Sequence, residues 1–118
     1  MKSKIKKAYL IDAEKREITQ VEVGDYTTYY PLLKCEVFTT VGLEDDDTLY
    51  VDDEGLFQPQ ENFFMYQGYN QPLAGNGLVL GTDKEGNSVD PKMTLETLKS
   101  KVKFMNRKEV YQWVQENT

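Results

Sequence analysis

The stretch that decides the fold runs from position 69 to position 83 and reads Tyr69-Asn70-Gln71-Pro72-Leu73-Ala74-Gly75-Asn76-Gly77-Leu78-Val79-Leu80-Gly81-Thr82-Asp83. Three glycines, one proline and two asparagines surround its short apolar run. An apolar run with turn residues at both ends is typical of a buried strand. We therefore expect residues 78–80 to form the last or next-to-last strand of a sheet, entered through a positive-φ turn at Asn76 and Gly77.

The length and composition predict a single domain, residues 1–118. A chain of 118 residues with 39% hydrophobic and 12% aromatic side chains can bury one core. We expect the basic residues 1–6 to be disordered and residues 106–118 to form a C-terminal helix. No apolar run of about 18 residues is present and none follows the basic start, so we expect neither a membrane span nor a signal peptide.

The sequence contains no histidine and one cysteine, Cys35. Without histidine, the zinc sites and the Ser–His or Cys–His catalytic pairs that depend on that residue are excluded. A single cysteine cannot form an internal disulfide and is typical of a reducing cytosol. Cys35 lies among Leu33 and Val37, so we expect a buried, inert thiol.

The first half of the chain predicts two hairpins. Residues 7–12 and 18–23 form an antiparallel pair, in which uneven apolar spacing indicates a bulge. Residues 36–43 and 48–52 form a second pair across an acidic turn, after which Leu56 and Phe57 are expected to pair briefly.

Between the hairpins, the sequence predicts a short helix that ends near Lys34. Proline is tolerated in a first helical turn, where its missing N–H loses no partner, and costs about 3 kcal/mol further along. Because Pro31 must lie in the first turn, we expect Thr27 or Thr28, rather than Asp25, to cap this helix.

The second half of the chain predicts one further strand and two helices. Residues 62–66 read as a short, apolar and central strand. One helix begins after Thr94, and a second begins at the capping box of Asn106 and Glu109, with an extended link or edge strand at 102–105 between them. The expected fold is α+β: an antiparallel sheet of about five or six strands with two or three short helices packed on one side.

Acidic residues are concentrated at positions 44–54, where seven acids and no base occur. The segment lacks the acid–glycine spacing of a calcium loop, and its two acidic turns are ~15 Å apart at about 3.3 Å per residue, so we predict no metal site. It forms either two solvated turns or an acidic face for a basic partner; a mimic of DNA would need one continuous face. Because the net charge is −6, we do not expect direct nucleic-acid binding.

Tyrosine is abundant, with eight residues, and serves both cores and interfaces. Tyr29 and Tyr30 cannot both face inward from one helix, so we expect one of them, with Tyr69, at a stacking or interface surface; half-buried packing is the alternative. The candidate interaction surface therefore comprises Asp45, Asp46, Asp47, Asp52, Asp53, Glu54, Tyr29, Tyr30 and Tyr69.

A candidate ligand loop is formed by Asn76, Gly77, Gly81 and Thr82. Backbone amides of glycine turns can bind phosphate. Phosphate-binding glycine loops, however, lie after a strand and before a helix, whereas these glycines precede a strand and include no lysine. A plain turn is therefore the alternative. We identify no catalytic residue and no cofactor site, although twenty acids leave a carboxylate pair open.

Three segments carry a resemblance to a known family. They are Leu-Tyr-Val-Asp-Asp-Glu-Gly-Leu (49–56), Gln-Pro-Leu-Ala-Gly-Asn-Gly-Leu-Val-Leu-Gly-Thr-Asp (71–83) and Glu-Gly-Asn-Ser-Val (85–89), followed by a Leu-rich amphipathic helix and Val-Lys-Phe-Met. From Tyr9 to about Met105 the chain resembles small hypothetical proteins carried by bacteriophages, plasmids and other mobile elements, departing at Pro31 and in the Trp113 tail. The resemblance implies a mobile-element protein in a bacterial cytoplasm and no functional residues, since the family has no assigned activity.

These observations favour a small, acidic, cytosolic and non-enzymatic protein that binds a basic host protein through an acidic, tyrosine-rich surface. A binder of a small ligand, such as a nucleotide signal, is the alternative. A carboxylate- and metal-dependent enzyme ranks last, because no ligand spacing supports it. Exposed aromatic side chains would also be compatible with a homodimer.

Overall fold

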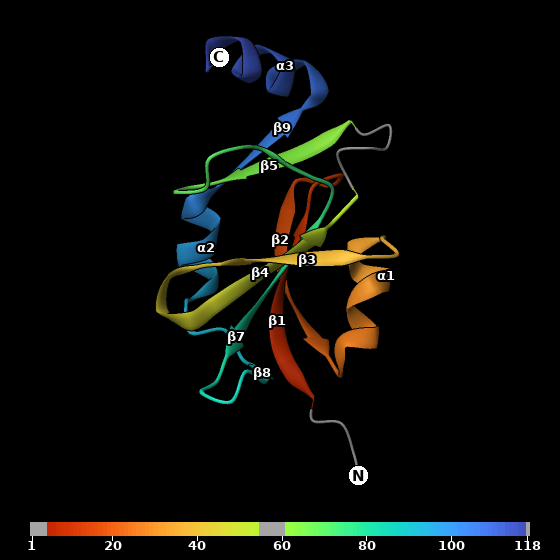
Figure 1. The fold of residues 1–118 in the computed structure, drawn as a ribbon, viewed down its shortest axis with the longest axis vertical. Coiled ribbons are helices and arrows are strands. Elements are labelled where there is room, and N and C mark those ends of the chain that lie inside the picture. Colours follow the sequence, from red (N-terminus) through yellow and green to blue (C-terminus); the bar gives the residue numbers. More distant parts are fainter. Residues whose placement is uncertain (1–4, 55–60, 118) are drawn as a thin grey trace.

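Two antiparallel sheets and three helices make up the fold (Figure 1). A computed structural model describes residues 5–54 and 61–117. The brief pairing expected at Leu56 and Phe57 lies outside the described residues, as do residues 1–4 of the segment expected to be disordered. Lys6, from the same segment, begins the first strand.

The larger sheet has six strands in the order β2-β1-β7-β4-β3, with β8 paired to the end of β7. The strands are β1 (Lys6–Asp12), β2 (Glu17–Val23), β3 (Phe38–Gly42), β4 (Asp47–Asp52), β7 (Gly77–Thr82) and β8 (Ser88–Val89). Both expected hairpins are confirmed, as β1–β2 and β3–β4. The bulge expected in the first hairpin does not form, because its residues pair one to one from Lys6–Val23 to Asp12–Glu17.

The central strand is β7, which contains the apolar run at 78–80 and is the next-to-last strand of this sheet along the chain. Its residues from Gly77 to Gly81 are all buried. Leu78 and Leu80 pack towards α1 (Tyr29–Leu33), whereas Val79 packs towards the smaller sheet. A strand that is buried on both faces is apolar throughout, which explains the continuous run.

The smaller sheet has the order β6-β5-β9, with β5 (Asn62–Tyr66) between β6 (Leu73–Ala74) and the edge strand β9 (Val102–Asn106). Phe64 and Tyr66 face the core shared with the larger sheet, while Phe63 packs with Met105 on the opposite face, against α3 (Arg107–Glu116). Because β5 is apolar on both faces, it needs cover on both, and it is central in its own sheet.

The α+β class is confirmed, and the helices lie in three different places. The helix α1 covers one face of the larger sheet, and α2 (Leu95–Lys101) contributes Leu98 to the core on the other face. The helix α3 lies beyond the smaller sheet (Figure 1). The expected arrangement, one sheet with the helices on one side, is therefore wrong. The apolar faces of the two sheets are covered at three separate buried clusters.

The caps of the two C-terminal helices are those expected from the sequence. The Thr94 side chain caps α2, and Asn106 begins α3 with a complete capping box. The N-terminal helical segment differs, because the Asp25 side chain accepts a hydrogen bond from Thr27 N at the start of the 3₁₀ turn η1 (Tyr26–Thr28). Thr28 precedes α1 without a capping bond from its side chain.

The turn that enters β7 is held by the side chain of Asn76, which is 6% exposed. Its Oδ1 accepts a hydrogen bond from Ala13 N at 3.0 Å, and its Nδ2 donates one to Leu32 O at 3.0 Å. It thereby joins the first hairpin, α1 and the start of β7. The expected positive φ at Gly77 is wrong: the positive φ, 79°, occurs at Gly75.

We expect Asn76→Ala to lower the free energy of unfolding by about 2–4 kcal/mol, because it leaves the Ala13 N–H and the Leu32 carbonyl without their partner. Urea denaturation measures the change. Asn70→Ala, at an exposed asparagine, is the matched control and should change stability by less than about 0.5 kcal/mol. Equal effects of the two substitutions would contradict the role assigned to Asn76.

We also expect Gly77→Ala to destabilise the fold by about 1–3 kcal/mol and Gly77→Val by more, through overpacking. A Cβ at this position would lie 2.8 Å from Phe64 Cζ and 3.0 Å from Leu49 Cδ1. The control is Gly42→Ala, where a Cβ would meet nothing within 4 Å. Calorimetry should show a lower Tm for the Gly77 variants alone, and an unchanged Tm would rule out close packing as the reason for this glycine.

Candidate functional site

The acids of positions 44–54 lie at opposite ends of β4 and do not form one continuous face. One group forms the turn η2 (Glu44–Asp46) before the strand, and Asp52, Asp53 and Glu54 lie at its far end. The six residues of β4 extend over roughly 20 Å at about 3.3 Å each. The two ends are therefore separate sites.

Asp47 adds no exposed charge to either site, because the residue is 1% exposed. Its Oδ1 accepts a hydrogen bond from Lys92 N at 2.8 Å, and its Oδ2 accepts one from Met93 N at 2.9 Å. A buried carboxylate is tolerated when it accepts such bonds. Asp47 fixes the segment before α2 to the start of β4, which is a structural role.

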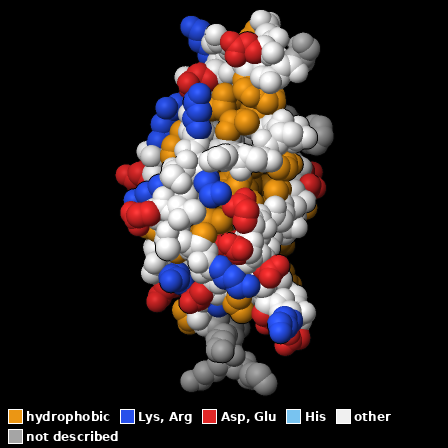
Figure 2. All heavy atoms as spheres, turned by 90° about the vertical axis from the view of Figure 1, so that its left-hand side faces the viewer, with side chains coloured by type: hydrophobic (Ala, Val, Ile, Leu, Met, Phe, Trp, Pro, Cys, Tyr) orange, Lys and Arg blue, Asp and Glu red, His pale blue; other side chains and the backbone are white. Residues whose placement is uncertain are grey.

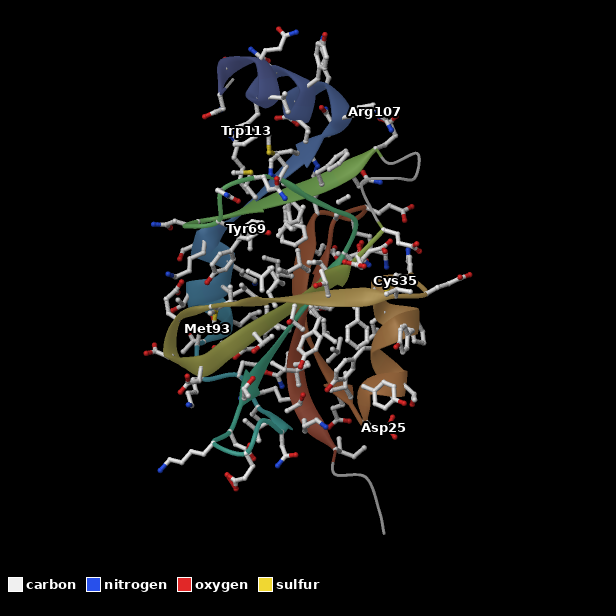
Figure 3. All side chains as sticks on the ribbon, viewed as in Figure 1. Asp25, Cys35, Tyr69, Met93, Arg107 and Trp113 are labelled. Carbon is white, nitrogen blue, oxygen red and sulfur yellow. The ribbon has the colours of Figure 1, made fainter. Side chains whose placement is uncertain are left out.

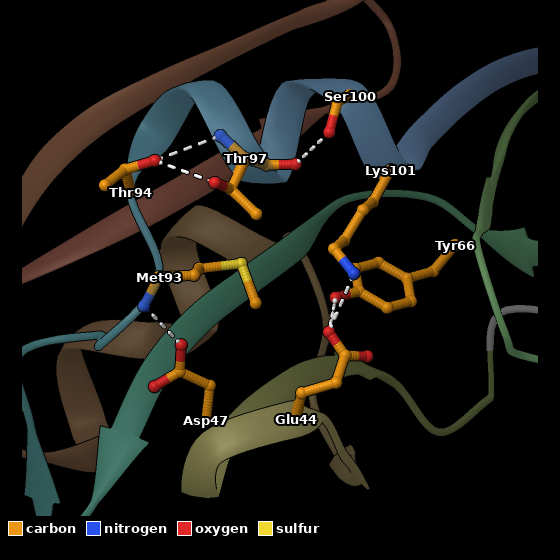
Figure 4. A network of polar contacts seen from close by, with 8 residues as sticks. All are labelled: Glu44, Asp47, Tyr66, Met93, Thr94, Thr97, Ser100 and Lys101. Carbon is orange, nitrogen blue, oxygen red and sulfur yellow. Dashed lines mark hydrogen bonds and ion pairs between the residues drawn. The ribbon is translucent and has the colours of Figure 1, made fainter.

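Two acids of the η2 end, Glu44 and Asp46, are paired with lysines, and Figure 4 shows the pair of Glu44 with Lys101. Glu44 Oε2 lies 2.9 Å from Lys101 Nζ and accepts a hydrogen bond from the Tyr66 hydroxyl at 3.3 Å, while Asp46 lies 3.5 Å from Lys92 Nζ. The bond from Lys101 lowers the pKa of Glu44, and burial, followed by the nearby Glu44 charge, raises the pKa of Tyr66. Figure 2 shows this side of the molecule, where acidic and basic side chains are interspersed.

An open groove of about 690 Å³ also lies at the η2 end. It brings Asp46 and Asp47 together with Thr82, a residue of the candidate ligand loop, and with Lys84 and Lys92. The hydroxyls of Thr82 and Thr48 are hydrogen-bonded to each other at 2.8 Å.

The other residues of the candidate ligand loop are buried in the fold. Asn76 has both ends of its amide engaged by the backbone of Ala13 and Leu32. Gly77 and Gly81 are buried strand residues, and a Cβ at Gly81 would lie 2.4 Å from the Asp90 carbonyl. Of the four residues, Thr82 is the one that lines a groove.

At the far end of β4, Asp52 and Asp53 come together with Tyr69 around a cleft of about 220 Å³. The sequence indicated all three residues as candidates, the two acids from segment 44–54 and the tyrosine from stretch 69–83. Tyr69 lies between the smaller sheet and the larger one (Figure 3), and Gln71 and Thr39 complete the polar wall. We call this pocket the acidic cleft; its other lining residues are Thr40, Val41, Val51, Pro72, Leu73 and Ala74.

The acidic cleft differs from the η2 end because its lining, as far as the structure describes it, includes no lysine or arginine. Residues 35–83 contain ten acids and neither lysine nor arginine, and every residue that lines the cleft comes from this segment. Within the described ranges, neither Asp52 nor Asp53 has a basic side chain within 4.0 Å; Asp52 Oδ1 accepts a hydrogen bond from Glu54 N. No basic side chain of residues 5–54 or 61–117 therefore forms an ion pair with the two acids of the cleft.

The two neighbouring tyrosines lie in different environments, as the helical geometry requires. Tyr29 is 2% exposed and stacks edge-on against Tyr50, with ring centroids 5.1 Å apart, so it is a core residue. Tyr30 is half-buried beside Phe38 and away from the acidic cleft. Tyr69 is thus the one candidate tyrosine that joins the acids.

The polar cleft residues that the sequence did not indicate are Thr39, Thr40 and Gln71. Their residue types carry no chemical signal, and their partners are distant along the chain. The sequence feature that could have indicated the cleft is the segment 35–83, which contains no lysine or arginine. Its acids can form ion pairs only with basic residues from outside the segment.

The acidic cleft can accept hydrogen bonds from a cation and offers a tyrosine beside it.

In the described part of the chain, no group of three or more metal-binding side chains is arranged to hold a metal ion. Cys35 is half-buried rather than buried as expected, because it follows the last turn of α1 instead of lying inside a core element. Partial burial still raises the pKa of its thiol to about 11, which keeps it protonated at neutral pH. No helix among the described residues is long and apolar enough to cross a membrane.

Comparisons with known proteins give a family and no activity. A family described as "Domain of unknown function (DUF3846)" matches residues 5–103. A protein from Sinorhizobium fredii (strain NBRC 101917 / NGR234), described as "Uncharacterized protein y4iR", is 33% identical over 92 residues, which cover 75% of this chain and 57% of the relative. The chain therefore spans little more than half of that relative, and no solved structure matches it significantly.

We expect Lys101→Met to raise the pKa of Glu44 and to lower stability at neutral pH by less than about 1 kcal/mol, because the pair is partly exposed. The folded-state pKa of Glu44 is lowered, so the contribution is present above the ordinary glutamate pKa and is lost as the pH falls through the lowered value. Denaturation at several pH values measures it. The exposed Lys99→Met is the control, and a difference from wild type that grows towards acid pH would contradict the pairing.

Proposed function

The chain belongs to the DUF3846 family, and from its own surface we propose that it is a non-enzymatic binding protein that engages a basic partner through the acidic cleft. The observation that carries this proposal is the position of Asp52 and Asp53 beside Tyr69, with no ion pair to either acid from the described basic side chains. In the fuller form of the proposal, the protein is encoded by a phage or other mobile element and acts on a host protein in the bacterial cytoplasm. The mobile-element origin rests on the resemblance of residues 49–56, 71–83 and 85–89.

The chemistry of the cleft favours a lysine or arginine side chain. A cation in the cleft gains Coulomb energy from the nearby charges of Asp52 and Asp53, and this energy is only partly screened because Val51 and Leu73 wall the cleft. The face of Tyr69 can add a cation–π contact worth about 0.5–2 kcal/mol. An anion would meet two negative charges and is disfavoured.

The two ends of β4 provide a matched pair of variants. Asp52→Asn with Asp53→Asn removes two charges from the cleft, and Asp45→Asn with Asp46→Asn removes two charges from the η2 end. Both pairs change the net charge equally, so a difference between them reports position rather than total charge. Neither pair alters the buried Asp47.

We expect the tagged wild-type protein and the Asp45/Asp46 variant to capture the same basic protein from bacterial lysate, and the Asp52/Asp53 variant to lose it. Identification by mass spectrometry and titration of the purified partner should show at least a tenfold weaker affinity for the cleft variant. Binding should also weaken steeply with salt. Equal binding by the two variants, or binding indifferent to salt, would rule out the cleft.

A small-ligand binder is the second candidate, favoured by the groove of about 690 Å³ at the η2 end. Its size suits a small molecule, and Lys84, Lys92 and Thr82 could contact an anionic group there. Thermal unfolding with a nucleotide panel tests it, because a ligand that binds the folded state raises the Tm. No shift with any nucleotide would remove this candidate.

A further inference from the structure

The two edge strands of the larger sheet differ in their charge. In the described part of the chain, the sheet ends at β2 on one side and at β3 on the other. The β2 edge carries Glu17 and Glu22, charges of the kind that discourage a further strand. The β3 strand, Phe-Thr-Thr-Val-Gly, carries no charged residue and no proline.

The hydrogen bonds between β3 and β4 show which backbone groups of β3 face outward. Val37 O accepts from Asp53 N at 2.9 Å, and Leu43 N donates to Asp47 O at 2.8 Å. In an antiparallel ladder the bonded residues alternate, so the odd-numbered residues of β3 bond to β4. The N–H and C=O groups of the even-numbered residues point away from β4; these residues are Phe38, Thr40 and Gly42.

This edge is accessible and long enough to receive a strand. Thr39, Thr40 and Gly42 are exposed, as is 47% of Val37 before the strand. Five residues extend for roughly 17 Å at about 3.3 Å each. An extended peptide that adds at such an edge gains main-chain hydrogen bonds without needing a particular sequence.

The charges at the two ends of β3 indicate which strand would add. The acidic cleft lies beside its first residues, and Thr39 and Thr40 belong to both the strand and the cleft. The turn after β3 carries the exposed Asp45 and Asp46. A second copy pairing edge to edge would bring acids against acids, so the edge selects a basic strand over itself.

We propose that β3 is the docking edge for an extended basic segment of the partner, which adds beside β3 as a further strand and places a lysine or arginine side chain in the acidic cleft. This inference rests on the proposed function and adds the conformation of the partner to it. Main-chain pairing supplies the hydrogen bonds, and the cleft supplies the preference for a cation and thereby the register.

The test uses fluorescence anisotropy with a synthetic peptide that has alternating valine and threonine at its centre and two arginines at each end. Thr40→Pro removes an outward N–H and no ladder bond, so the fold should be retained, with a Tm near that of wild type. We expect this variant to bind the peptide at least tenfold more weakly, and Thr40→Val to bind within threefold of wild type.

N-methylated peptides test the same pairing on the unaltered protein. Methylation of alternate amides along one edge of the peptide should abolish binding, and methylation along the other edge should spare it, although charge is identical. No saturable binding of the unmodified peptide, equal effects of the two methylation patterns, or a homodimer paired through β3 in solution would overturn the proposal.

The two proposals fail in different ways. If Thr40→Pro binds as tightly as wild type while the Asp52/Asp53 variant binds weakly, the cleft is retained and strand addition is overturned. If Thr40→Pro binds weakly while the Asp52/Asp53 variant binds as wild type, the basic partner of the cleft is overturned.

Discussion

The burial of β7 on both faces is the constraint on which the rest of the structure depends. Leu78 and Leu80 need α1 on one side, and Val79 needs the smaller sheet on the other. The strand can lie this deep because Gly77 leaves room for the side chain of Phe64. The turn that leads into β7 is fixed by the side-chain amide of Asn76, which forms hydrogen bonds with the backbone of Ala13 and of Leu32.

Charge is distributed around this core in a way that follows from chain order. The base-free segment 35–83 forms the strands β3 to β7, and all its acids except the buried Asp47 lie at the ends of these strands or in the turns between them. Lysines from the later, more basic part of the chain reach one end of β4, where Lys92 and Lys101 compensate the acids of η2. No described basic side chain pairs with the acids of the other end, and the acidic cleft keeps its charge.

Among the described strands, the same topology leaves β3 at an edge of the sheet, beside that charge. Sheet edges in proteins are usually blunted by charged side chains, proline or bulges, because unpaired backbone groups invite further strands. Here β3 is uncharged, while the acids lie beyond its two ends. Repulsion between copies would then protect the edge from self-association without closing it to a basic strand.

Local features were readable from the sequence: both hairpins, the caps at Thr94 and Asn106, the buried run at 78–80 and the acidic character of 44–54. Each depends on neighbours along the chain, through hydrogen-bond patterns and side-chain periodicity. The burial of Asp47, the separation of two sheets and the meeting of Asp52 with Tyr69 were not readable. They depend on contacts between distant segments. Only the packing of the two sheets determines which acids lie beside a lysine, which are buried, and which have no ion pair among the described residues.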